Sequence, residues 1–190
     1  MKRSRCWTRR GDLEKSREFI KRVICLLKLT GSLLLIFAGT LLGFTESRKL
    51  TVRVESLESF LRFLSAAKTE VRYSAVPVVQ IVARHGRELS FLRECVKRCG
   101  QGEGFADAWK RAALNSGKGD GFAAHDIELL LSFGEGFGAS DTDGQLSHME
   151  LFSGLFGTNL KSAREDRNRK SKLYLMLGVF AGLFSALMLC

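Results

Sequence analysis

The last 18 residues constrain this chain more than any other stretch, because residues 173–190 contain no charged side chain. As an α-helix rising about 1.5 Å per residue, this segment would be roughly 27 Å long, close to the hydrocarbon thickness of a bilayer. The segment before it, residues 161–172, holds six basic and two acidic side chains. Such a basic collar is typical of the cytoplasmic end of a membrane span. We predict a transmembrane helix at 173–190, since a buried core helix would need a larger core than this chain can build.

A second apolar segment, residues 23–44, is interrupted only by Lys28, whose long side chain can reach the headgroups. We predict an uncleaved transmembrane helix here, with a secretory signal peptide as the alternative. Each predicted span also carries two glycines four residues apart. Such pairs leave a flat strip on which another membrane helix can pack closely. The predicted packing residues are Gly39, Gly43, Gly178 and Gly182.

Basic charge is concentrated beside these two apolar segments. Residues 1–30 hold ten basic and three acidic side chains, whereas residues 45–160 hold fourteen basic and fifteen acidic ones. A nucleic-acid-binding protein would place its positive charge on the folded domain instead. The distribution therefore predicts contact with membrane lipid and argues against nucleic acid as a partner.

The region between the spans, residues 45–172, is predicted to form a soluble helical bundle, and no segment alternates like a strand. The fold class is all-α, with about six helices, of which the first and last continue into the two transmembrane helices. An apolar stripe at steps of three and four predicts a first helix reaching about Tyr73, and Pro77 is expected to start the next. A last helix is expected to begin near Ser140, whose hydroxyl would cap it. Short helices are predicted at 77–86, 88–98, 105–116 and 122–133.

No set of residues in the sequence makes a convincing catalytic group. His125 beside Asp126, and His148 near Asp141 or Asp143, are the candidate acid–base pairs. Polar residues at helix starts occur far more often without catalysis. We therefore predict a non-enzymatic structural or interaction protein without a small-molecule substrate.

The sequence also lacks a recognisable cofactor or metal motif. Cys95 and Cys99 share a helical face near His85, but a fourth ligand is missing, and two reduced cysteines facing a core explain the spacing better. Lys118 stands between glycines, but the remaining positions of a phosphate-binding loop are not matched. No cofactor and no metal are predicted.

Three polar residues near the start of the last helix are the candidate interaction site. Asp141, Gln145 and His148 are spaced by four and three, which places them on one face. That face is either an internal polar clasp against the short helices or a docking edge for a partner subunit.

Taken together, several motifs make the chain resemble the stage III sporulation protein AB family of endospore-forming bacteria, from about Leu27 to the C-terminus. The most specific is the stretch from Phe133-Gly134 through Gly138, Asp141 and Gln145 to His148. The others are Leu27-Lys-Leu-Thr-Gly31, Glu70-x-x-Tyr73-Ser-x-x-Pro77, Ala108-Trp109 and Leu177-Gly-Val-Phe-Ala-Gly182.

The resemblance implies a scaffold subunit of the channel complex between mother cell and forespore, required for endospore formation. This subunit resembles part of the type II secretion F-type platform protein and would dock a cytoplasmic ATPase. The implied location is the outer forespore membrane on the mother-cell side, with the bundle facing the cytoplasm. Its implied partners are the other subunits of the complex, and whether it forms a homo-oligomer is open. The alternative is a two-span receptor or sensor whose bundle binds a ligand.

Residues 1–22 depart from the family pattern, which begins almost at the first span. With two spans both ends lie on one side of the membrane, so this basic extension competes with the collar at 161–172 for the cytoplasm. We expect translation to start at Val23, which would remove the conflict. The N-terminal sequence of the purified protein decides this.

Overall fold

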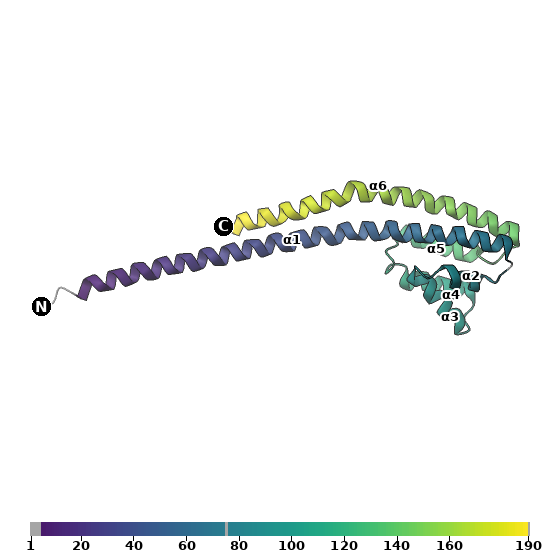
Figure 1. Cartoon of the computed structure of the whole chain (residues 1–190), viewed down its shortest axis with the longest axis horizontal. Coiled ribbons are helices and arrows are strands. Elements are labelled where there is room, and N and C mark those ends of the chain that lie inside the picture. Colours follow the sequence, from purple (N-terminus) through teal and green to yellow (C-terminus); the bar gives the residue numbers. More distant parts are fainter. Residues whose placement is uncertain (1–4, 75, 190) are drawn as a thin grey trace. The chain divides into compact units, whose positions relative to one another are not determined.

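The computed structural model describes residues 5–74 and 76–189, and within them it contains six α-helices and no strand. The predicted all-α class is therefore confirmed. The helices are α1 (Arg5–Tyr73), α2 (Val78–His85), α3 (Ser90–Gly100), α4 (Phe105–Ser116), α5 (Ala124–Gly136) and α6 (Thr142–Leu189) (Figure 1). The first and last are the long helices that the apolar periodicity predicted.

The helices α2 and α4 begin and end close to the predicted residues, whereas α3 and α5 each begin and end two or three residues later than predicted. Pro77 is the N-cap of α2, where its missing N–H is harmless, and Gly86 is the C-cap. Gly121 and Gly138 have φ values of 88° and 90°, which side-chain-bearing residues rarely adopt, and each lies in a turn next to α5. The start of α3 is capped from a distance, because the Asp120 carboxylate accepts the backbone N–H groups of Ser90 and Phe91 at 3.0 and 2.9 Å.

Two compact units make up the chain. One unit consists of Met1–Glu46 with Lys172–Cys190, and the other is Ser47–Ser171. Within the Ser47–Ser171 unit, α3 packs against α2 and α4, and α4 packs against α5 (Figure 1). Its core is rich in aromatic rings, and the largest fully buried side chains include Trp109, Phe60, Phe91, Phe133 and Phe156.

The predicted transmembrane helices stay predictions. A search of the residues that the structure describes finds no helix with both the length and the apolar character needed to cross a membrane. The unit Met1–Glu46 with Lys172–Cys190 nevertheless exposes many large apolar side chains, among them Leu34, Phe37, Leu41, Phe44, Met176, Leu177, Phe180 and Phe184.

Candidate functional site

The turn between α5 and α6 contains the first of the three predicted site residues, Asp141. Because α6 begins at Thr142, Asp141 is its N-cap, and its Oδ1 accepts the backbone N–H of Gly144 at 3.2 Å. The sequence had assigned the cap to Ser140, which was wrong by one position. Asp141 is exposed to solvent, so its carboxylate stabilises the positive end of the helix while remaining accessible.

Gln145 and His148 make contacts inside the unit instead. The Gln145 Nε2 donates to the Ser140 carbonyl at 2.9 Å, while its Oε1 is buried and has no donor among the described residues. The His148 Nε2 lies 2.9 Å from the Phe133 carbonyl of α5. A carbonyl only accepts, so this nitrogen carries the proton. The imidazole also stacks on the Phe133 ring, with centroids 5.3 Å apart and planes 23° apart.

The close approach of α5 and α6 at His148 depends on a glycine. A Cβ atom added to Gly136 would lie 2.4 Å from Cε1 of the His148 ring, far inside van der Waals contact. The structure thus brings His148 against α5 and leaves Asp141 exposed to solvent. Whether any of them docks a partner stays a prediction.

We expect His148→Ala to destabilise the Ser47–Ser171 unit by about 1–3 kcal/mol, because the hydrogen bond from His148 to the Phe133 carbonyl and the ring stacking are both lost. The exposed neighbour Ser147 provides the control, and Ser147→Ala should change stability by less than about 0.5 kcal/mol. Urea unfolding of a fragment spanning Ser47–Ser171, followed by circular dichroism, measures both. Unchanged stability in His148→Ala with loss of binding to a partner subunit would favour the docking edge over the clasp.

An apolar hollow of about 360 Å³ opens beside the same turn. Val78 and Val79 of α2 form one side, Phe105 and Ala106 of α4 another, and the end of α5 with its following turn completes it. Glu135 lies at this hollow and is exposed. The hollow has the size for one or two apolar side chains of a partner and lacks the convergent polar groups of a small-molecule site.

A buried carboxylate joins three helices elsewhere in the unit, and the sequence did not reveal it. Asp126 of α5 is completely buried, and its two oxygens accept Nε and Nη2 of Arg53 from α1 at 2.7 and 3.1 Å. Asn159 of α6 donates to the same carboxylate at 2.8 Å, and the backbone N–H of Ala123 donates at 2.9 Å. The hydrogen bond to Asp126 raises the pKa of the Arg53 guanidinium, which therefore stays protonated.

Neither candidate acid–base pair is brought into contact in the structure. Since Asp126 is occupied by Arg53 and Asn159, it does not pair with His125, whose side chain is 68% exposed and lies 3.7 Å from Glu128 Oε2. His148 is held by the Phe133 carbonyl rather than by Asp141 or Asp143. The described residues contain no group of three or more potential metal ligands.

Cys95 lies in the core, as its spacing from Cys99 suggested, and burial raises the pKa of its thiol to about 12. Burial also raises the pKa of the Cys99 thiol. At pH 8 only about one Cys95 in ten thousand would be a thiolate, the nucleophilic form. We expect Cys95 to resist iodoacetamide at pH 8 in the folded chain and to react once urea unfolds it. Mass spectrometry of the digested peptides checks this, and rapid alkylation without denaturant would contradict the buried position.

The four glycines predicted to pack membrane helices meet in the unit Met1–Glu46 with Lys172–Cys190. A Cβ atom added to Gly39 would lie 2.6 Å from the Gly178 carbonyl oxygen and 3.3 Å from Cα of Gly182. One added to Gly178 would lie 2.5 Å from the Gly39 carbonyl oxygen and 3.3 Å from Cα of Gly43. The segments of α1 and α6 in this unit therefore approach backbone to backbone, which only residues without side chains permit.

The described residues define an all-α helical bundle, in which a buried ion pair and Asn159 join α1, α5 and α6. The chain belongs to the stage III sporulation protein AB family, whose model matches residues 28–190. That family is one of sporulation structure and assembly and not a known enzyme family, which suggests a role in sporulation. No curated protein and no solved structure matches the chain.

Proposed function

We propose that this chain is a non-enzymatic, membrane-anchored scaffold subunit of a sporulation channel complex between mother cell and forespore. Family membership is the observation that carries the sporulation role. In this proposal the unit Met1–Glu46 with Lys172–Cys190 is the anchor in the outer forespore membrane, and the Ser47–Ser171 bundle faces the mother-cell cytoplasm. The bundle would dock a cytoplasmic secretion-type ATPase and other subunits of the complex.

The apolar surface of the first unit supports the anchor. Leu34, Phe37, Phe180 and Phe184 are each 65–72% exposed, although their helices pack closely at the four glycines. A water-soluble protein rarely leaves so many large apolar side chains in solvent, whereas lipid tails would cover them favourably. The basic collar at 161–172 favours a cytoplasmic position for the neighbouring bundle.

The turn between α5 and α6 supports the docking role. It places an exposed carboxylate, Asp141, near the end of the unit that carries the apolar hollow lined by Val78, Val79 and Phe137. Apolar contact surrounded by charge is the usual composition of an interface between subunits. His148 contributes by fixing the turn, since it holds α6 against α5.

Deletion of the gene tests the sporulation role directly. We expect the deletion strain to grow normally and to form few heat-resistant spores, with full recovery when the chain is supplied from another locus. Normal spore yield after deletion would contradict the proposal.

The anchor is tested separately by replacing two exposed residues of the apolar unit. Phe180→Lys with Phe184→Lys should release the chain from membranes during an alkaline wash, because charges within a bilayer are costly. As the matched control, Phe180→Leu with Phe184→Leu should remain in the membrane fraction. If the charged variant also remains, lipid does not cover this surface.

A further inference from the structure

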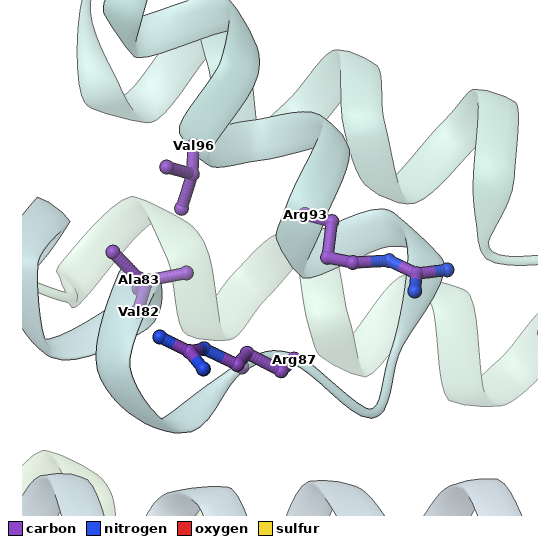
Figure 2. A pocket seen from close by; sticks show the side chains of 6 residues that line it. Val82, Ala83, Arg87, Arg93 and Val96 are labelled. Atoms are coloured by element: carbon purple, nitrogen blue, oxygen red, sulfur yellow. The ribbon is translucent and has the colours of Figure 1, made fainter.

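Both ends of the short helix α2 carry an apolar hollow, and the charges at the two hollows are opposite. Val78 and Val79 line the hollow at the start of the helix, where Glu135 lies. Val82 and Ala83 line a second hollow of about 150 Å³ near its end, where Arg87 and Arg93 lie (Figure 2). The α2 residues that line the two hollows are four positions apart, so the hollows are separated by roughly 6 Å along the helix axis.

The charged residues at these hollows lack partners within the unit. Six of the nine arginines from Arg53 to Arg164 form ion pairs with acidic side chains. Among the described residues, Arg87 and Arg93 have no such partner, and both are exposed. Glu135 is likewise exposed and, over the same residues, pairs with no basic side chain. Unpaired charges beside apolar hollows are positioned to meet charges of another molecule.

The sequence of charges along the chain extends this asymmetry. Between Lys118 and Lys161 there is no lysine or arginine, while seven acidic residues occur. Residues 84–118 contain eight basic and four acidic side chains. The outer side of α2 between the hollows carries little charge, because Val79 and Ala83 are half-buried there and Gln80 is exposed.

We propose that two copies of this chain associate through α2, packed antiparallel around a two-fold axis. An isologous interface of this kind requires a self-complementary surface, in which each contact occurs twice. The antiparallel arrangement places Glu135 of each copy at the Arg87 hollow of the other, so both ion pairs form together. A second copy is the favoured occupant because this chain itself supplies the matching charge at the matching separation along α2.

Charge reversal tests the proposal with the full chain in detergent micelles. Tagged and untagged copies are mixed, and the untagged copy retained on the tag is measured. The wild-type chain should retain its own copy. Glu135→Arg alone and Arg87→Glu alone should each reduce retention about tenfold, because two ion pairs per dimer become repulsive. Mixing the Glu135→Arg chain with the Arg87→Glu chain should restore retention, since both pairs are then attractive again.

Lys118→Glu is the matched control, because Lys118 is exposed and, within the described residues, equally without an acidic partner. It should retain copies as the wild-type chain does. Three results would overturn the proposal: no retention by the wild-type chain, retention unaffected by the single reversals, or no restoration in the mixed pair. The single reversals distinguish a two-fold contact through α2 from association through the apolar unit, because they would leave the latter unchanged. Restored retention in the mixed pair then assigns the contact to Glu135 and Arg87.

Discussion

Trp109→Ala is expected to destabilise the Ser47–Ser171 unit by about 3–5 kcal/mol, the usual cost of removing a large aromatic side chain from a core. Trp109 is 1% exposed, and its ring lies 5.4 Å from that of Phe91 and 5.5 Å from that of Phe133, centroid to centroid. Its Nε1 also donates to the Leu130 carbonyl at 2.7 Å. The substitution therefore leaves a cavity and also removes the hydrogen bond from the indole to the Leu130 carbonyl.

Leu114 is the matched control for this prediction, because it lies on the same helix and is 48% exposed. Leu114→Ala should cost less than about 1 kcal/mol. Urea unfolding of the fragment, followed by circular dichroism, compares the two variants. Equal unfolding midpoints would show that Trp109 does not organise the core.

A second residue, Gly134 of α5, lies against the same indole ring. A Cβ atom added to Gly134 would lie 2.1 Å from Cδ1 of Trp109, so the indole packs directly on the α5 backbone. The sequence predicted that this helix ends at residue 133, yet α5 continues to Gly136. Spacing alone does not show which ring from a distant helix needs the space that a glycine leaves.

The helices themselves were largely predictable, because their boundaries depend on local chemistry. Apolar periodicity identified the end of α1 at Tyr73, and Pro77 and Gly86 marked the bounds of α2. The N-cap of α6 was predicted at Ser140 and lies at Asp141. Serine and aspartate are both good N-cap residues, and only the backbone conformation decides between them.

The candidate site was predictable only in part, because its contacts join residues far apart in sequence. His148 was identified, but its partner is the carbonyl of Phe133, which no motif announces. Arg53 and Asp126 are 73 positions apart, and each looks like an ordinary surface charge. One feature of the sequence did indicate that Asp126 could be buried. Asp126 lies in the first turn of α5, three residues after Ala123, and one turn before Leu130, which is buried.

Asp126→Asn is expected to cost about 3 kcal/mol or more, because it leaves the Arg53 guanidinium without its carboxylate in a mostly buried position. Arg53 is 20% exposed and Asp126 is fully buried, so water replaces little of the lost interaction. Asparagine keeps the size of the side chain, which separates the loss of charge from a change in packing. The exposed pair of Arg164 and Glu58 supplies the control, since Glu58→Gln should cost only about 0–1 kcal/mol.

A second background isolates the ion pair from the other bonds of Asp126. In a chain that already carries Arg53→Met, no guanidinium remains to be stranded, so Asp126→Asn should cost markedly less there. What remains should reflect the bonds from Asn159 and the Ala123 backbone, which asparagine keeps only in part. Urea unfolding of the four fragments gives the coupling free energy. A cost that is equal in both backgrounds would mean that Arg53 and Asp126 do not stabilise the junction of α1, α5 and α6 as a pair.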